Sequence, residues 1–599
     1  MKKILSLFTL LFAFFGMAWA QDTTKPFKVS GAPTETSWAE NTTWYMIRTT
    51  EADGGRHAAW LSTKGENNAT ADGILTPRNP NQPTDNYGLW CFVGNDTEGY
   101  KIYNKGEGVT KVLGFQGSGN NATAKMYVES DNTEGVTVRY DYVATGVKHP
   151  NLDPSKVGCL KLHNSANNYW NNLNGGNYGI HLGLWDNAGA VNGKASTFTF
   201  EEVEIEVAKT TLQAAITSAQ PYVNLIGKGT GKYTTPEGSQ SLNTLIADAN
   251  EAIRNGDYFT CVDLTNELNT LISGLTLNQP EIGKFYRFCC VNSTEYISQE
   301  QVEKKLHTNA NVDNATIFYC QTFNGGTKLL AYNNGQYFGN DGRHNFGYLP
   351  VGTQTGIKFE YFKANTIGKY TVRQGGNRFI CGNDHILDSG DANFDKNDNR
   401  YHWAIEEVTT LSVTVSAAGW ATLYAPVALT IPATEGLTVY TAAVEGNTLK
   451  LKALNGTIPA NMPVVIEAAE GKYNFNINYN AAAQTAQAAG KGLSGTLETI
   501  NKPADKTIYT LQKPAVANNE IGFYKYGGET LQGFRAYGEN LLGTTSTAEG
   551  LIFDKGDVTA IENVEINDGK QTVIYDLNGR RVEKMLKGIY IVNGKKVIK

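Results

Sequence analysis

The fold is decided by a phrase that occurs three times between residues 285 and 408: Phe285-Tyr286-Arg287-Phe288, Lys328-Leu329-Leu330-Ala331-Tyr332-Asn333 and Lys369-Tyr370-Thr371-Val372-Arg373. Each phrase is strand-like and leads through a turn to an aromatic or apolar pair. The pairs are Tyr296-Ile297, Tyr337-Phe338 and Phe379-Ile380, and the period is about 40 residues. Another β phrase follows each pair, at 317–319, 357–361 and 403–405. The range 280–408, the second module, is therefore predicted as three copies of one β unit.

The range 41–206, the first module, repeats this order with longer insertions. Its phrases and pairs are Tyr45-Met46-Ile47 with Trp60-Leu61, Tyr100-Lys101-Ile102-Tyr103-Asn104 with Val112-Leu113, and Leu160-Lys161-Leu162-His163-Asn164 with Tyr169-Trp170. Returning strands are predicted at 89–92 and 198–200. The two modules also end in a similar way: an aromatic or apolar segment precedes Glu201-Glu202-Val203 in the first and Glu406-Glu407-Val408 in the second. We therefore expect two copies of one module.

A threefold repeat of hairpin pairs resembles the β-trefoil, which implies a short closed barrel with a hairpin cap. Closure leaves few open strand edges. The similarity to ricin-type lectins is one of outline, because their Gln-x-Trp marker is absent: the corresponding ends read Gln321-Thr322-Phe323, Phe198-Thr199-Phe200 and Trp403-Ala404-Ile405. The alternative is an unrelated β-sandwich whose alternation only looks threefold.

Between the modules the hydrophobic period changes from 2 to 3.6. Three apolar stripes follow one another over 207–278: Leu212, Ala215, Ile216, Ala219 and Val223; Leu242, Leu245, Ile246, Ala249 and Ile253; Leu264, Leu268, Leu271, Ile272 and Leu275. They predict a small three-helix bundle, and this range resembles the spacer modules between ligand-binding domains of bacterial surface proteins. The stripes are expected to form the core of a spacer rather than a binding site.

Beyond the second module the pattern is β again. Short strands separated by Gly, Pro and Asn predict a sandwich-like domain over 409–558, the sandwich domain. The tail 561–599 carries two hairpin signals, Leu577-Asn578-Gly579 and Val592-Asn593-Gly594. Its blocks Tyr575-Asp576-Leu577-Asn578-Gly579-Arg580 and Lys587-Gly588-Ile589-Tyr590 resemble the C-terminal sorting domain of proteins exported by the type IX secretion system of Gram-negative bacteria. The resemblance implies the secretion machinery as a partner. The predicted class is therefore mainly β and multi-domain: two trefoil-like modules around a three-helix bundle, a sandwich-like domain and a small C-terminal β domain.

The first 20 residues predict export. Lys2 and Lys3 precede an apolar run at 4–15, and Ala18-Trp19-Ala20 supplies a cleavage site, so we expect the mature chain to begin at Gln21. The apolar run is too short for a bilayer span, and no later stretch is long enough, so an extracellular or outer-surface location without a transmembrane segment is expected. The formal charge of -6 becomes 50 - 58 = -8 without the two signal lysines. This acidic balance without a basic cluster argues against nucleic acid as a partner.

The chemistry motifs are weak. Seven cysteines without Cys-x-x-Cys spacing are predicted as mostly buried apolar side chains, with one disulfide within 289–381 left open. The glycine run 227–232 has the wrong spacing for a phosphate loop and is predicted as a turn. Residues 395–399 alternate oxygen side chains as a calcium loop does, but Arg400 stands at the glycine position, which favours a polar loop. No catalytic residue, metal site or cofactor is predicted.

Aromatic side chains flanked by amides and carboxylates remain as candidate ligand contacts, because an aromatic plane packs against the apolar face of a sugar while Asn and Asp bind its hydroxyls. The candidates are Tyr169, Trp170, Asn171, Asn172, His181, Trp185 and Asp186 in the first module, and Tyr332, Asn333, Asn334, Tyr337, Asn340, Asn383 and Asp384 in the second. Trp170 and Trp185 are the strongest. The alternative is that the aromatics fill the core and the asparagines form turns.

These observations favour a secreted or surface-attached protein that binds glycans or glycoproteins through paired modules, without catalysis of its own. Two alternatives stay open: a structural or adhesive surface protein that binds host or matrix protein, and a non-catalytic or cryptic component of a secreted glycoside hydrolase system.

Overall fold

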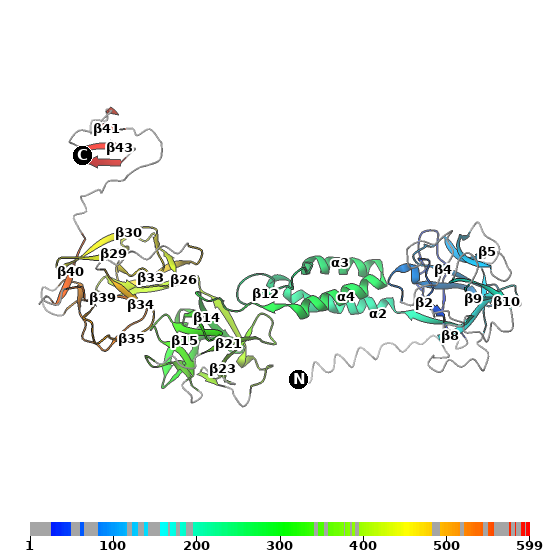
Figure 1. Cartoon of the computed structure of the whole chain (residues 1–599), viewed down its shortest axis with the longest axis horizontal. Helices are drawn as coiled ribbons and strands as arrows, with labels where there is room; N and C mark the ends of the chain where they lie inside the picture. Colours follow the sequence, from blue (N-terminus) through cyan, green and yellow to red (C-terminus); the bar gives the residue numbers. More distant parts are fainter. Residues whose placement is uncertain are drawn as a thin grey trace. The chain divides into compact units, whose positions relative to one another are not determined.

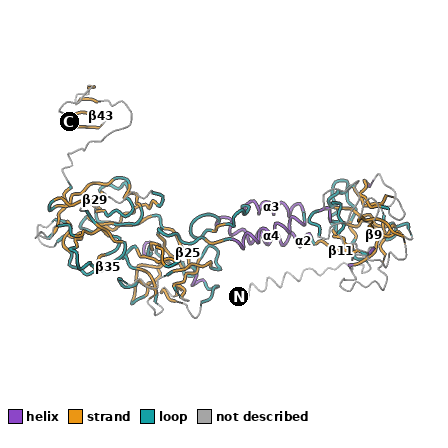
Figure 2. Tube along the Cα trace, in the orientation of Figure 1, coloured by secondary structure: helices purple, strands orange, loops and turns teal. Residues whose placement is uncertain are grey.

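The protein is described here as a computed structural model. It describes residues 25–49, 60–64, 82–116, 122–129, 137–141, 156–165, 168–174, 180–186, 196–340, 345–352, 358–375, 378–383, 386–389, 394–481, 492–514, 520–542, 549–555, 574–576, 581–582, 589–592 and 595–598. Among these residues strands dominate, and the α-helices lie in one stretch (Figure 2). The predicted mainly β class is confirmed. The chain divides into two compact units, one of 1–223 with 236–274 and the other of 224–235 with 275–599.

In the first module, six strands pair in a closed cycle. Each strand is hydrogen-bonded to the next and the last returns to the first, so the cycle has no open edge. The strands, in order round the cycle, are β2 (Trp44–Thr49), β3 (Trp90–Asn95), β4 (Gly99–Asn104), β7 (Val138–Asp141), β8 (Val157–Leu162) and β11 (Phe198–Val203). The predicted phrases at 45–47, 100–104 and 160–162 all lie in this cycle, and β7 is a strand that the sequence did not single out.

Two hairpins extend the cycle: β5 (Lys111–Gln116) with β6 (Thr123–Val128), and β9 (Asn168–Asn174) with β10 (Ile180–Asp186). They meet where Gly183 pairs with Thr123. A short strand, β1 (Val29–Ser30), adds in parallel to β3. Just before it, the buried Phe27 ring stacks 3.9 Å from the Phe92 ring, among the core side chains of the cycle. The N-terminal segment therefore contributes to the core of the first module.

Three helices follow, α2 (Ile205–Ala219), α3 (Leu242–Asn255) and α4 (Tyr258–Gly274), and they pack side by side (Figure 1). Ser241 caps α3 by accepting a hydrogen bond from the Thr244 N–H, and Gly256 ends it in the left-handed conformation. The predicted stripes are largely buried, except that Ala252 rather than Ile253 is the last fully buried side chain of α3. The predicted spacer, 207–278, does not fall within one compact unit, because residues 224–235 and 275–278 belong to the unit that contains the second module.

The segments at 224–235 and 275–278 are attached to the second module through tyrosines. The strands β12 (Tyr233–Thr234) and β13 (Thr276–Leu277) pair with each other. The Tyr370 hydroxyl accepts a hydrogen bond from the Gly231 N–H at 2.7 Å and donates one to the Asn278 carbonyl at 2.6 Å. The glycine run is thus a turn held against the module, as its spacing predicts.

The second module repeats the closed cycle of six strands, again pairing last to first. The strands are β14 (Phe285–Cys290), β17 (Phe318–Phe323), β18 (Gly326–Ala331), β21 (Phe359–Lys363), β22 (Tyr370–Gln374) and β25 (Trp403–Glu407). Three hairpins interrupt them: β15 (Tyr296–Val302) with β16 (Lys305–Asn309), β19 (Tyr337–Asn340) with β20 (Phe346–Tyr348), and β23 (Arg378–Asn383) with β24 (Ile386–Ser389). One hairpin therefore follows every second strand of the cycle, which fits the threefold phrase.

The range 409–555 contains two packed sheets. One has the order β26 (Thr410–Val415), β33 (Gly471–Asn478), β28 (Ala428–Thr430) and β31 (Thr457–Ile458). The other has the order β27 (Trp420–Leu423), β32 (Val464–Glu467), β29 (Thr438–Glu445), β30 (Thr448–Leu454), β40 (Gly550–Asp554), β37 (Gly522–Lys525), β36 (Ile508–Gln512), β39 (Arg535–Glu539) and β34 (Ser494–Thr496). A short pair, β35 (Ile500–Asn501) with β38 (Thr530–Leu531), stands apart. Leu411, Leu423 and Ile466 are among the buried side chains of the core that the two sheets share.

At the C-terminus, β41 (Ile574–Asp576), β42 (Arg581–Val582), β43 (Ile589–Val592) and β44 (Lys595–Ile598) form one sheet. The strands of both predicted hairpins pair, β41 with β42 and β43 with β44. The turn residues 577–580 and 593–594, like the predicted signal at 1–20, lie outside the described residues. None of the helices in the described ranges is long and apolar enough to cross a bilayer.

All seven cysteines are described, and all are free thiols. Six are buried and Cys289 is half-buried, so the interpretation as apolar side chains fits six of them, and the disulfide left open within 289–381 is not formed. Burial raises the pKa of the Cys381 thiol to about 11, as it does for Cys289. These thiols are therefore protonated at neutral pH and are poor nucleophiles.

Candidate functional site

The strongest candidate site lies on the β9–β10 hairpin of the first module. Trp170 and Trp185 come from its two strands, but the register places them on opposite faces: Trp170 is opposite Leu184, and Trp185 is opposite Tyr169. The face with Trp170 is the core face, and the face with Trp185 is called the outward face, on which Trp185 is exposed while Tyr169 and Asn171 are buried.

Trp170 is on the core face and is fully buried. Its ring lies 5.9 Å from those of Phe115 and Phe198. The prediction that Trp170 offers a ring to a sugar is therefore wrong, because no part of that ring is accessible. Its role is to fill the core of the first module.

Trp185 is 40% exposed, the highest exposure of any tryptophan side chain among the described large hydrophobic residues. Its cross-strand neighbour Tyr169 is buried, and the Tyr169 hydroxyl accepts a hydrogen bond from Lys161 Nζ at 3.3 Å. Tyr169 is thus held in place beside an exposed indole. The fold thus brings the predicted residues Tyr169 and Trp185 together on one face. Lys161, which contacts Tyr169, was missed from the sequence, although the alternation at 160–162 places it on the opposite face of its strand from Leu160 and Leu162.

Asn171 lies on the same face as Trp185, opposite Gly183, which adds no side chain. Its Nδ2 donates a hydrogen bond to Ser196 Oγ at 2.7 Å, while its Oδ1 has no partner among the described residues. A buried amide oxygen without a partner is costly and can accept a hydrogen bond from a hydroxyl. Asn172 is buried on the core face, so its predicted contact with a ligand is wrong.

His181 and Asp186 lie on β10, opposite Leu173 and Asn168. Their side chains are outside the described residues, as are those of Asn383 and Asp384 in the second module, where Asn383 ends β23. The predictions for these four side chains therefore stay predictions.

In the second module the predicted turn after β18 is not free: it holds the sandwich domain. The Tyr332 ring packs 5.0 Å from Phe534, and its hydroxyl donates to the Ser412 carbonyl at 3.2 Å. Burial raises the pKa of Tyr332 to about 12. The ring is half-buried against the sandwich domain and its hydroxyl is used in that contact, so the predicted ligand role of Tyr332 stays a prediction.

The next residues of the turn bind the same domain through the backbone. The Thr499 N–H donates to the Gly335 carbonyl at 2.7 Å, and the Thr499 hydroxyl donates to the Asn334 carbonyl. Gln532 Nε2 donates to the Asn333 carbonyl at 3.3 Å. The backbone carbonyls of Asn333 and Asn334 therefore serve the contact between domains, while the predicted ligand role of their half-buried side chains stays a prediction.

Tyr337 completes this contact. Its ring is almost fully buried, and its hydroxyl donates to a carboxylate oxygen of Glu498 in the sandwich domain. Burial and then Glu498 raise the pKa of the Tyr337 phenol. Lys328 Nζ donates to the same hydroxyl at 2.6 Å. The predicted ligand role of Tyr337 is wrong, because its ring is buried at the contact between the two domains. Glu498 and Thr499 were missed because nothing near them in sequence marks a domain contact.

The equivalent turn of the first module holds the domain that follows it too. Lys105 comes directly after β4, as Tyr332 comes directly after β18. Lys105 Nζ donates to the Gly256 carbonyl at the end of α3, at 2.9 Å, and burial lowers the pKa of Lys105. Both modules thus use the turn after the third strand of the cycle to attach the next domain.

Asn340 is held within the second module: Arg378 Nη1 donates to its Oδ1 at 2.6 Å. Its predicted oxygen acceptor is therefore already in use. A second aromatic feature lies nearby, where the half-buried rings of Phe379 and Phe394 stack 3.8 Å apart. Phe394 was missed because it stands alone in a polar loop.

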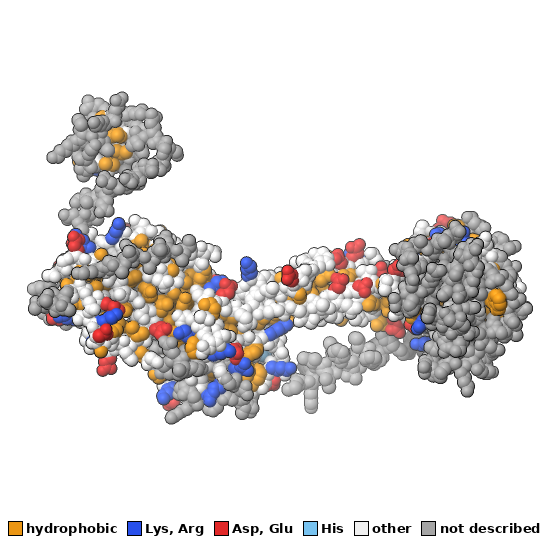
Figure 3. All heavy atoms as spheres, viewed as in Figure 1, with side chains coloured by type: hydrophobic (Ala, Val, Ile, Leu, Met, Phe, Trp, Pro, Cys, Tyr) orange, Lys and Arg blue, Asp and Glu red, His pale blue; other side chains and the backbone are white. Residues whose placement is uncertain are grey.

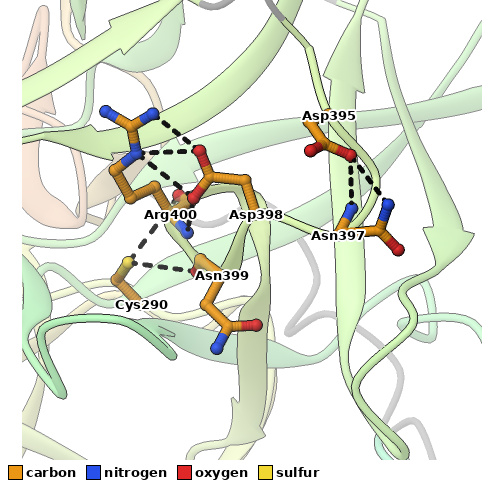
Figure 4. Close-up of polar contacts among 6 residues, drawn as sticks. All are labelled: Cys290, Asp395, Asn397, Asp398, Asn399 and Arg400. Carbon is orange, nitrogen blue, oxygen red and sulfur yellow. Dashed lines mark hydrogen bonds and ion pairs between the residues drawn. The ribbon is translucent and has the colours of Figure 1, made fainter. Parts of the chain in front are cut away.

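The loop that resembles a calcium site uses its carboxylates internally (Figure 4). Asp395 Oδ1 accepts hydrogen bonds from the Asn397 N–H and Nδ2. Asp398 accepts from the Arg400 N–H and pairs with its guanidinium at 2.6 Å. That guanidinium holds the pKa of Asp398 below its usual range. Within the described ranges no three His, Cys, Asp or Glu side chains converge as metal ligands.

No protein-family model matches the chain, and no curated protein matches it either. Among solved structures, a designed threefold-symmetric protein, ThreeFoil, is 16% identical, and the match covers 26% of this chain and 97% of the other with a TM-score of 0.19. A ricin B-like lectin from Macrolepiota procera, in complex with lactose, is 11% identical over 22% of this chain and all of the other, with a TM-score of 0.18. An endo-β-galactosidase from Clostridium perfringens is 9% identical over 61% and 68%, with a TM-score of 0.19. Scores of this size do not establish a shared fold.

Proposed function

We propose that this chain is an exported glycan-binding protein, and that its first module holds a sugar ring on the outward face of the β9–β10 hairpin. Both modules are β-trefoils in this proposal, supported by the two closed cycles of six strands. The chain has no catalytic activity of its own, works outside the cell, and uses its C-terminal sheet as the signal for the secretion machinery.

The observation that carries the proposal is the exposed indole of Trp185 beside Tyr169. An indole plane packs against the C–H face of a pyranose, and its water is displaced at little cost. Asn171 lies on the same face, but its Oδ1 is buried, so the proposal rests on the Trp185 ring alone. In the second module, Tyr332 and Tyr337 pack against the sandwich domain, so the proposal places no sugar site on them.

The test is a glycan array with the full mature chain and two variants. Trp185→Ala should weaken binding of the glycans that score on the array by about tenfold or more, because truncating a central aromatic contact costs about 2 kcal/mol or more and about 1.4 kcal/mol corresponds to tenfold. Phe362→Ala is the matched control, since Phe362 is an aromatic side chain of the second module with the same 40% exposure. The proposal fails if no glycan binds, or if the two variants bind glycans equally well.

A further inference from the structure

A groove in the first unit is not explained by sugar binding. It has a volume of about 440 Å³ and lies where β11 leaves the first module and the helices begin. Glu202 and Glu204 line one side, Val207 comes from α2, and Tyr258, Val262 and Asn266 come from α4. Its volume is within the usual range for ligand pockets, about 300–1,000 Å³.

The floor of the groove is apolar and accessible. Val207 is 53% exposed, the highest value among the exposed large hydrophobic residues of the described chain. Val262 and Tyr258 are half-buried beside it, on a helix that packs directly against α2. An aliphatic side chain placed here would remove apolar surface from water on both sides, which is favourable in proportion to the buried area.

The rim of the groove carries two carboxylates, one of which has no ion pair in the described part of the chain. None of the residues that line it is Lys, Arg or His. Glu202 pairs with Lys28 at 2.6 Å, outside the lining, whereas Glu204 is exposed and forms no ion pair in the described part of the chain. Glu204 also stands at the N-cap of α2 without a capping hydrogen bond from its side chain. An available carboxylate therefore lies next to an apolar floor.

From this combination we infer that the groove binds a basic peptide segment of a partner protein, one that places an aliphatic side chain on Val207 and a Lys or Arg ammonium or guanidinium against Glu204. Charge complementarity requires a positive charge on the partner, and the two adjacent helices form walls along which a peptide can lie. The unpaired carboxylate of Glu204 repels an acidic segment. A neutral sugar carries no charge to pair with Glu204.

The site is separate from the hairpin that carries Trp185, so its test does not depend on the glycan proposal. The probe is a fluorescein-labelled peptide of alternating lysine and leucine, added to the full mature chain and followed by fluorescence anisotropy. A peptide of alternating glutamate and leucine is the counterpart of opposite charge. We expect binding of the lysine peptide only, with an affinity that falls as salt rises.

Two variants locate the contact. Glu204→Lys and Val207→Lys should each weaken binding of the lysine peptide by about tenfold or more, since each places a positive charge at the groove. Ile282→Lys is the matched control, because Ile282 is 52% exposed and lies in the other unit. Circular dichroism confirms that each variant is folded; both groove positions are exposed, so Lys is accommodated there. The inference is overturned if the glutamate peptide binds as well, if neither peptide binds, or if Val207→Lys and Ile282→Lys behave alike.

Discussion

Replacing Gly335 with Ala should separate the second module from the sandwich domain. A Cβ on Gly335 would lie 2.5 Å from Gly533 Cα, 2.8 Å from Gly533 N and 2.9 Å from Thr499 N. All three are backbone atoms of the sandwich domain, so no side-chain rotation can relieve the overlap. The backbone of Gly335 also has a φ of 66°, which adds strain for any residue with a Cβ.

The magnitude has two parts. The left-handed conformation costs an Ala residue about 1–2 kcal/mol relative to Gly. Overpacking adds about 1–3 kcal/mol, or else the domains move apart and lose the hydrogen bonds from Thr499, worth about 0.5–1.5 kcal/mol each. Gly325→Ala is the control, because Gly325 has a φ of 74° and nothing within 4 Å of the added Cβ. The two variants share the backbone cost, so their difference of about 1–3 kcal/mol measures the contact.

Differential scanning calorimetry of the full chain is the assay. The second module and the sandwich domain share one hydrophobic cluster, so we expect them to unfold together in the native chain. Gly335→Ala should lower their common transition by several degrees more than Gly325→Ala does, at about 2–4 °C per kcal/mol, or split it in two. Equal shifts for the two variants would refute the reasoning that the turn is a rigid contact.

Three further results follow from the packing. Phe27→Ala should destabilise the first module by up to about 3–5 kcal/mol and speed hydrogen exchange in the strand that contains Phe92, whereas unchanged exchange there would show that the ring is not a core residue. Trp170→Ala should lower the free energy of unfolding of the first module, measured by urea titration, by a similar amount, and a folded, equally stable variant would contradict its burial. Arg400 lowers the pKa of Asp398 in the folded protein, so the stabilisation from this pair is present above the ordinary aspartate pKa of about 3.9 and is lost as pH falls through the lower folded pKa. Asp398→Asn should therefore flatten the decline of thermal stability on the acid side. An identical decline in the variant and the native chain would argue against the pairing.

The strand cycle could be predicted from the sequence because its signal is local. Each strand-like segment is rich in aromatic and aliphatic side chains and is followed by a turn and an aromatic or apolar pair, and the threefold recurrence of this order predicts closure without knowledge of any contact. The strand β7 was missed because Val138–Asp141 is short and is separated from its neighbours by long insertions. The C-terminal strands followed from Asn-Gly turns, which limit hairpin geometry strongly.

The candidate site was predicted less well, for a reason that Tyr332 makes plain. A tyrosine followed by two asparagines has the same sequence signature on a ligand surface and in a turn that binds another domain. Which of these applies depends on Glu498 and Phe534, far away in the chain and recognisable as neighbours only in the fold. Trp170 and Trp185 differ in that the register of β9 with β10 places them on opposite faces of the hairpin, and a shift of the register by one residue would exchange the faces.

The turn after the third strand has a consequence for valency. Each of the two modules uses the turn after the third strand of its cycle to attach the domain that follows it. That turn is therefore not available to other molecules while the following domain is in place. Adding a domain after a module thus lowers the number of contacts that the module can make with other molecules at once.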